Sequence, residues 1–237
     1  MLRLLAAVTA LLLLAAPATA QQRTQYVFAI SWQPAFCETA PRRPECTSQT
    51  AERFDAAHFA LHGLWPQRVD YCGVSRDLQY ADRDGDWRDL PDPGASKATL
   101  EKLRQMMPGA QSGLDRHEWL RHGTCYGEPA EAYFSDALAM LEAVNASAVR
   151  ELFARNVGKQ VTQKQVRAAF DTAFGKGAGD RVRLGCERDG KRRIITELTI
   201  GLTGKINGPA DFRRLVMAAR PTSGGCDAGI VDAVGLQ

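Results

Sequence analysis

The chain has six cysteines, and all of them follow an apolar N-terminal stretch with the features of an export signal. Residues 1–20 combine a positive charge at Arg3, an apolar run and the small residues Ala18-Thr19-Ala20 of a cleavage site. The run is shorter than the ~20 residues that span a bilayer, so we expect cleavage before Gln21 and no membrane segment. We therefore expect a secreted or periplasmic protein whose cysteines are oxidised in pairs.

The spacing of the cysteines does not determine how they pair, because six cysteines can combine in many ways. Cys37 and Cys46 bracket a loop with two prolines, Pro41 and Pro44, which suggests a local disulfide. Zinc ligation is the alternative, and it is disfavoured because the sequence contains no Cys-x-x-Cys pair.

The charge of the chain is nearly balanced, with 30 Lys and Arg against 27 Asp and Glu and a net charge of +3. Proteins that hold nucleic acid by bulk charge are far more basic, so an acidic partner of this chain must be bound locally. The 45% of hydrophobic residues excludes a disordered chain and suffices for a domain with its own core.

Hydrophobic periodicity places strands near both ends of the chain and helices in its middle, which favours an α+β fold over an alternating α/β fold. The polar stretch 82–94, rich in Asp, Gly and Pro, predicts a surface loop. No repeat or linker divides the sequence, so we expect a signal peptide over 1–20 and a single domain over 21–237. The expected strands span 25–33, 58–64, 181–187 and 193–202, and the expected helices span 96–107, 129–144, 148–156 and 162–174.

The four histidines form two close pairs, His58 with His62 and His117 with His122. On a helix that Gly123 ends, the second pair would share one face with Glu118 and Arg121. Two imidazoles, a carboxylate and a guanidinium would then converge on one patch. The alternative is a solvated helix face carrying ordinary side-chain ion pairs.

The first histidine pair lies in a segment that predicts a strand, where His58 and His62 would share one face. Gly63 would allow a ligand or a second backbone to come close. Trp65, before Pro66, could present its ring as a flat platform at the strand end. The alternatives are core packing for Trp65 and a half-buried structural role for His58.

This set of side chains suits metal-free cleavage of RNA. The reaction needs a base to deprotonate the 2′-hydroxyl and an acid to protonate the leaving 5′-oxygen, and two histidines can supply both near neutral pH. Arg121 and a protonated His117 could stabilise the charge of the transition state. Because DNA lacks the 2′-hydroxyl, we expect it to resist cleavage.

The two segments resemble the active-site segments of the ribonuclease T2 family. One reads Leu-His-Gly-Leu-Trp-Pro from Leu61 to Pro66, and the other reads His-Glu-Trp-Leu-Arg-His-Gly-Thr-Cys from His117 to Cys125. The resemblance extends loosely from Gln25 and weakly into the last predicted strands. It implies a secreted monomeric endoribonuclease of low base specificity, active without metal or cofactor on single-stranded RNA. It also implies an α+β fold with a central antiparallel sheet flanked by helices and stapled by disulfides.

The resemblance also implies a role for each matching residue. His122 would be the base and His62 the acid as a 2′,3′-cyclic phosphate forms, and the roles would reverse in its slower hydrolysis to a 3′-phosphate. Glu118 would polarise or orient the catalytic groups. The implied substrate-binding residues are His117, Arg121 and Trp65, and the implied disulfides are Cys37–Cys46, Cys72–Cys125 and Cys186–Cys226.

Two positions depart from the family pattern. Arg121 replaces the usual lysine. The positive charge is kept, but a planar guanidinium replaces the compact ammonium group. Gln67 stands where some members carry an acidic residue, so adenine preference does not follow. Two other functions remain open at this point: a metallohydrolase that uses His58 and His62 as ligands, and a non-catalytic RNA-binding or cytotoxic module that has kept the shape of the site.

Overall fold

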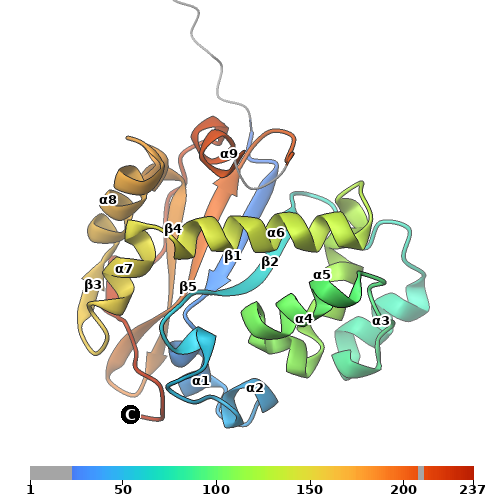
Figure 1. Ribbon diagram of the computed structural model, residues 1–237, viewed down its shortest axis with the longest axis horizontal. Coiled ribbons are helices and arrows are strands. Elements are labelled where there is room, and N and C mark those ends of the chain that lie inside the picture. Colours follow the sequence, from blue (N-terminus) through green and yellow to red (C-terminus); the bar gives the residue numbers. More distant parts are fainter. Residues whose placement is uncertain (1–22, 208–210) are drawn as a thin grey trace, which may run out of the picture.

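The computed structural model describes residues 23–207 and 211–237, so the predicted signal peptide lies outside the described residues. The described part contains a six-stranded sheet in the order β2-β1-β5-β6-β3, with β4 paired to β5 (Figure 1). All pairings are antiparallel except that of β5 with β6, which is parallel at Ile194 and Ile230. The strands are β1 (Tyr26–Ser31), β2 (Ala60–Pro66), β3 (Gln160–Thr162), β4 (Val182–Asp189), β5 (Arg192–Leu202) and β6 (Ala228–Ile230).

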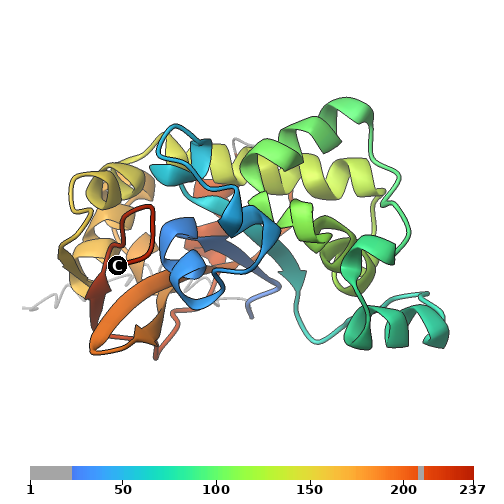
Figure 2. The same cartoon turned by 90° about the horizontal axis from the view of Figure 1, so that it is seen from below.

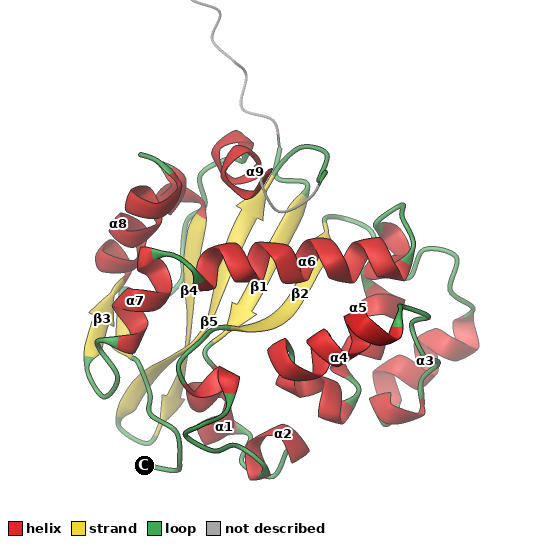
Figure 3. Ribbon diagram, viewed as in Figure 1, coloured by secondary structure: helices red, strands yellow, loops and turns green. Residues whose placement is uncertain are grey.

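Helices surround this sheet, as Figure 3 shows by colour. In both ribbon views α3, α4 and α5 gather at one end of the molecule, while α7 and α8 lie at the other end beside β3 (Figures 1 and 2). The predicted α+β fold is confirmed. The helices are α1 (Gln33–Thr39), α2 (Pro44–Thr47), α3 (Arg76–Asp84), α4 (Lys97–Met106), α5 (Leu114–Arg121), α6 (Ala130–Asn145), α7 (Ala148–Ala154), α8 (Gln163–Phe174) and α9 (Phe212–Ala218).

The core lies between the sheet and the helices. Trp32, Phe59 and Phe153 are fully buried and pack ring against ring, with centroids 4.6–5.5 Å apart. The indole nitrogen of Trp32 donates to the carbonyl of Asp232 at 2.8 Å, which ties the first strand to the segment after β6. Among the described helices, none has the length and hydropathy needed to cross a membrane.

Most of the sequence-derived elements agree with the structure, and the helix ends have the expected chemistry. Ser96 caps α4 by accepting from the backbone nitrogen of Thr99, and Thr162 forms a capping box with Gln165 at the start of α8. The hairpin of β4 and β5 turns at Gly190 and Lys191, directly after the paired residues Asp189 and Arg192.

The first strand is shorter than the prediction of 25–33. It ends at Ser31, and Gln33 already begins α1 with Pro34 in its first turn. The fixed φ of proline suits the first turn of a helix, and that position does not need the missing N–H. The residues before Pro34 are types that are common in strands, so the sequence pattern does not reveal where the strand ends and the helix begins.

The prediction of a loop over 82–94 is wrong at its beginning. Ser75 caps α3, which continues through Asp84, and a short 3-10 helix follows at Trp87–Asp89. Asp82 is 2% exposed and not part of a solvated loop. The segment looked like a loop because α3 is short and polar on its outer face.

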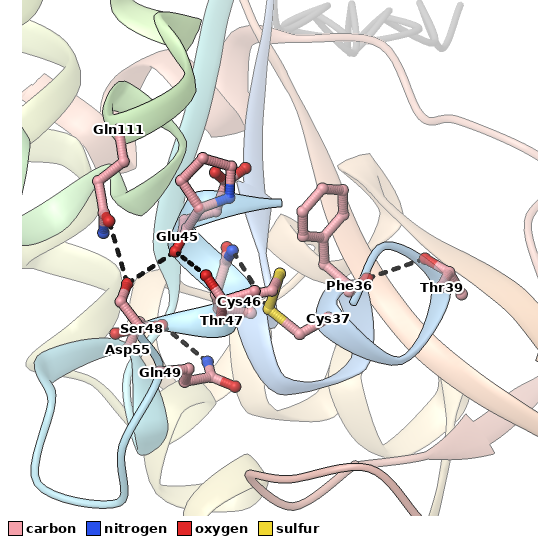
Figure 4. Close-up of a disulfide and its surroundings, with 12 residues drawn as sticks. Phe36, Cys37, Thr39, Glu45, Cys46, Thr47, Ser48, Gln49, Asp55 and Gln111 are labelled. Atoms are coloured by element: carbon pink, nitrogen blue, oxygen red, sulfur yellow. Dashed lines mark hydrogen bonds between the residues drawn. A yellow bond between two sulfur atoms is a disulfide. The ribbon is translucent and has the colours of Figure 1, made fainter. Parts of the chain in front are cut away.

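Three disulfides staple the fold, and they join the same pairs that the family resemblance implies: Cys37–Cys46, Cys72–Cys125 and Cys186–Cys226. Figure 4 shows the first of them connecting α1 to α2. Next to it, the hydroxyl of Ser48 donates to Gln111 at 3.0 Å, which holds this corner against the segment before α5. The corner carries residues that line a pocket described below.

Candidate active site

His62 occupies an irregular position in the sheet. Ala29 pairs with Gly63 and Ile30 pairs with Leu61, so His62 is the extra residue of a β-bulge between β1 and β2. A bulge breaks the strict alternation of side chains and re-aims the bulged residue, and such bulges are common next to active sites. His62 therefore points into a cleft, with its side chain 34% exposed, and does not follow the simple alternation assumed from the sequence.

A carboxylate from a distant strand holds one nitrogen of His62. The Nδ1 atom lies 2.5 Å from Oε1 of Glu197 on β5, and the Nε2 atom lies 3.9 Å from Oε1 of Glu118. Burial lowers the pKa of His62, but the hydrogen bond to Glu197 and the two negative charges outweigh it, so the pKa is raised above its ordinary value. The surroundings of His62 thus stabilise its protonated form.

The second histidine segment forms α5 and the turn after it, and its polar residues gather as predicted. Glu118 is 1% exposed, and its Oε2 accepts a hydrogen bond from the indole nitrogen of Trp65 at 2.8 Å. Burial raises the pKa of Glu118 to about 7. Gly63 makes this contact possible, because a Cβ atom at that position would overlap with the Glu118 carboxylate and with the Trp65 ring.

Asp82, a residue that the sequence placed in a loop, fixes His117. Its Oδ1 lies 2.8 Å from Nδ1 of His117, and its Oδ2 accepts from the Tyr71 hydroxyl at 2.6 Å. The ring of Trp87 stacks on His117 with centroids 4.2 Å apart. Desolvation lowers the pKa of His117 despite the bond to Asp82. The hydrogen bond to Asp82 and the stacking on Trp87 therefore hold the His117 imidazole in one orientation.

His122 follows the last residue of α5 and has no such partner. Its Nδ1 atom is buried and makes no hydrogen bond with the described residues. Desolvation, together with the nearby positive charges of Arg121, His117 and His62, lowers its pKa to about 3. His122 is thus a neutral imidazole over a wide range of pH.

Trp65 lies close to both histidines, His62 and His122. Its ring centroid is 5.1 Å from that of His62 and 5.7 Å from that of His122. Both histidines line one pocket of about 540 Å³ together with Glu118, His117 and Arg121. The guanidinium of Arg121 is exposed and lies 4.0 Å from the carboxylate of Asp70.

The structure separates His58 from this site. Its Nδ1 lies 3.0 Å from the carbonyl of Phe54, and its ring stacks on that of Phe54, which makes it a structural residue before β2. A metal site built on His58 and His62 is therefore not present among the described residues. A different set, His117, Glu118 and His122, brings three ligand atoms within 4.8 Å of one another and could hold a metal ion.

Comparison with known proteins identifies the family of this site. The family model described as "Ribonuclease T2 family" matches residues 23–211. The chain belongs to the ribonuclease T2 family. As a member of this family it is an endoribonuclease, and the pocket shared by His62 and His122 is its candidate active site.

Individual relatives agree with this assignment. Ribonuclease I of Escherichia coli (strain K12) is 30% identical over 226 residues, covering 85% of this ribonuclease and 83% of the relative. Intracellular ribonuclease LX of Solanum lycopersicum is 32% identical, over 51% of this chain and 48% of that protein. The crystal structure of RNase NT in complex with 5′-AMP has a TM-score of 0.58 at 20% identity, covering 89% of this chain and 98% of that one, which shows a shared fold.

Two residues of the ribonuclease site escaped the sequence analysis. Glu197 is 135 residues from His62, and Asp82 is 35 residues from His117. Neither lies in the two motif segments, and both are single carboxylates in a chain with 27 Asp and Glu. Only the pairing of β1 with both β2 and β5 brings Glu197 to His62.

Proposed function

We propose that this ribonuclease is exported, acts as a monomer and cuts single-stranded RNA without a metal ion. The first step is transesterification to a 2′,3′-cyclic phosphate, and slower hydrolysis of that phosphate gives a 3′-phosphate. Export rests on the predicted signal peptide and on the three disulfides, which are typical of oxidising compartments. Low base specificity rests on the stacking platform that Trp65 could offer in an open pocket.

One observation carries this proposal: the two histidines beside Trp65 have opposite electrostatic surroundings. His62, with Glu197 on its Nδ1, has a raised pKa and is suited to donate a proton. His122, whose pKa is lowered to about 3, stays neutral at mildly acidic pH and so has a nitrogen free to accept one. These environments support the proposed roles of His62 as the acid and His122 as the base of the transesterification.

The bond changes follow from these assignments. His122 takes the proton of the 2′-hydroxyl, and the 2′-oxygen attacks the phosphorus. The bond to the 5′-oxygen breaks, and His62 donates its Nε2 proton to that oxygen, since its Nδ1 is occupied by Glu197. In the second step His62 removes a proton from water, and His122 returns its proton to the 2′-oxygen.

Three further residues surround the phosphate in this proposal. Arg121 offers an exposed guanidinium, whose fork suits phosphate oxygens. His117 directs Nε2 toward the pocket because Asp82 holds its Nδ1. Glu118, whose pKa is raised to about 7, is mostly protonated at mildly acidic pH and can then donate to a non-bridging oxygen without repelling it.

Digestion of a defined oligoribonucleotide with mass analysis of the ends tests this proposal. We expect cyclic phosphate termini first and 3′-phosphates later, unchanged cutting in excess chelator, and no cutting of the matching DNA. Substitution His122→Ala or His62→Ala should abolish the cyclic product. Loss of activity in chelator would favour a metal held by His117, Glu118 and His122. Equal activity of the wild type and His122→Ala would refute the mechanism.

A further inference from the structure

A chain of adjoining pockets extends the active site along the sheet. The pocket of the two catalytic histidines adjoins a second pocket of about 420 Å³, and His62 lines both of them. The second pocket shares Gly185, Cys186 and Glu187 with a third pocket of about 410 Å³ on β4 and β5. A strand of RNA that ran from Trp65 past His62 to the hairpin of β4 and β5 would pass these three pockets in turn.

The third pocket is strongly basic. Arg183, Arg188 and Arg193 line it, against the single carboxylate of Glu187. All three arginines are exposed, and no ion pair or hydrogen bond among the described residues joins any of them to a carboxylate. Arg192, the neighbour of Arg193 on β5, by contrast contacts Glu38, Asp189 and Asp232.

The register of the hairpin makes this arrangement unfavourable without an anion. Arg188 on β4 lies directly opposite Arg193 on β5. Like charges at directly opposed positions of an antiparallel pair destabilise the sheet. A bound phosphate would relieve that repulsion, because a guanidinium fork pairs with phosphate oxygens in two-pronged fashion. The chain as a whole has a net charge of only +3, so these three arginines are a local concentration of positive charge.

We propose that Arg183, Arg188 and Arg193 bind phosphates of the RNA strand on the 3′ side of the cut. This inference rests on the proposed function, in which His62 protonates the 5′-oxygen of the departing nucleotide. The departing nucleotide then occupies the pocket on the far side of His62, and the strand continues from it to the arginines. The enzyme would therefore favour substrates that extend several nucleotides downstream of the scissile bond.

Chimeric oligonucleotides with one ribonucleotide in a DNA strand test the proposal, because only one bond in them has an adjacent 2′-hydroxyl. Three substrates are compared: a dinucleotide, the same step with four nucleotides added on the 3′ side, and the same step with four added on the 5′ side. Exposed ion pairs each contribute about 1.4- to fivefold, so two such pairs predict that the 3′ extension raises kcat/KM by between about 2- and 25-fold.

The double variant Arg188→Gln with Arg193→Gln should lose the gain from the 3′ extension and keep the dinucleotide rate. Its dependence on salt with the extended substrate should also weaken, by about 0.7 in logarithmic slope for each phosphate that the variant no longer neutralises. The matched control is Arg104→Gln with Lys164→Gln, which removes the same charge from exposed positions on α4 and α8.

The outcomes are distinct. The proposal is supported if the 3′ gain disappears in the arginine variant but remains in the control, with an unchanged or higher Tm for the arginine variant because the repulsion is gone. It is overturned if the 3′ extension gives no gain, if only the 5′ extension does, or if the gain survives the double substitution. Failure of the wild type to cut any of the three substrates would instead count against the proposed function.

Discussion

Substitution of Glu197 by Gln isolates the part that this carboxylate has in proton donation. The side chain keeps its shape and an oxygen acceptor for Nδ1 of His62, which lies 2.5 Å from the carboxylate in the wild type, but loses the negative charge. Burial still lowers the pKa of His62, whereas the hydrogen bond that raises it is weaker without the charge. The pKa of His62 should therefore fall. A smaller fraction of His62 is then protonated at neutral pH, and its ring is oriented less firmly.

The size of the effect follows from the hydrogen bond. Bonds to charged groups contribute about 1.5–3 kcal/mol, and the lower half of that range applies because both side chains are partly exposed, 34% for His62 and 25% for Glu197. Since about 1.4 kcal/mol corresponds to tenfold in rate, we expect kcat on a dinucleotide to fall by about 10- to 40-fold.

Two substrates with different leaving groups make the assay specific. A dinucleotide releases a poor alkoxide that needs the proton of His62, whereas a nucleoside 3′-(4-nitrophenyl phosphate) releases a phenolate that hardly needs it. Glu197→Gln should therefore slow the dinucleotide strongly and the aryl ester little, while His122→Ala, the control, should slow both. If Glu197→Gln lowers the rates on both substrates equally, Glu197 stabilises the fold and does not assist proton donation by His62.

Three further predictions concern the same site. The profile of kcat/KM against pH should rise as His122 loses its proton near its pKa of about 3. It should fall as His62 loses its own proton, at a pH above that of an ordinary histidine because its pKa is raised; a rate that still climbs at pH 9 contradicts this pair. Asp82→Asn should raise KM more than it lowers kcat, because without the negative charge it weakens the 2.8 Å hydrogen bond that orients the phosphate-binding His117, while leaving His62 and His122 in place; steady-state kinetics with a dinucleotide measures this, and a loss confined to kcat would refute it. Gly63→Ala should reduce kcat by displacing Glu118 from Trp65, and tryptophan fluorescence should report the change; unchanged kinetics would mean that the Glu118–Trp65 bond has no part in catalysis.

The sequence named the residues of the two motif segments, which the structure brings to one pocket, but not the carboxylates outside these segments. His117, Glu118, Arg121 and His122 lie within six positions, so helix geometry alone brings them together. The bulge that re-aims His62 depends on the register between β1 and β2, which no local pattern in the sequence specifies.

The elements of the fold were likewise predicted in some parts of the chain and missed in others. Strands and helices with a long periodic pattern were predicted, including α6 and the hairpin of β4 and β5. The three-residue strand β6 and its parallel pairing with β5 were missed, because such short segments are defined by their neighbours and not by their own composition. Helix α3 was missed because polar residues dominate it.

The contacts of residues 226–232 make the central sheet dependent on a segment that follows the other described strands in the chain. Cys226 closes the third disulfide, β6 joins β5, and the carbonyl of Asp232 accepts a hydrogen bond from the indole nitrogen of Trp32. In the proposed export, the first two disulfides can form before this segment has crossed the membrane. The central sheet is complete only when the segment has arrived, so a chain truncated near position 225 should contain the first two disulfides, yet lack a finished core.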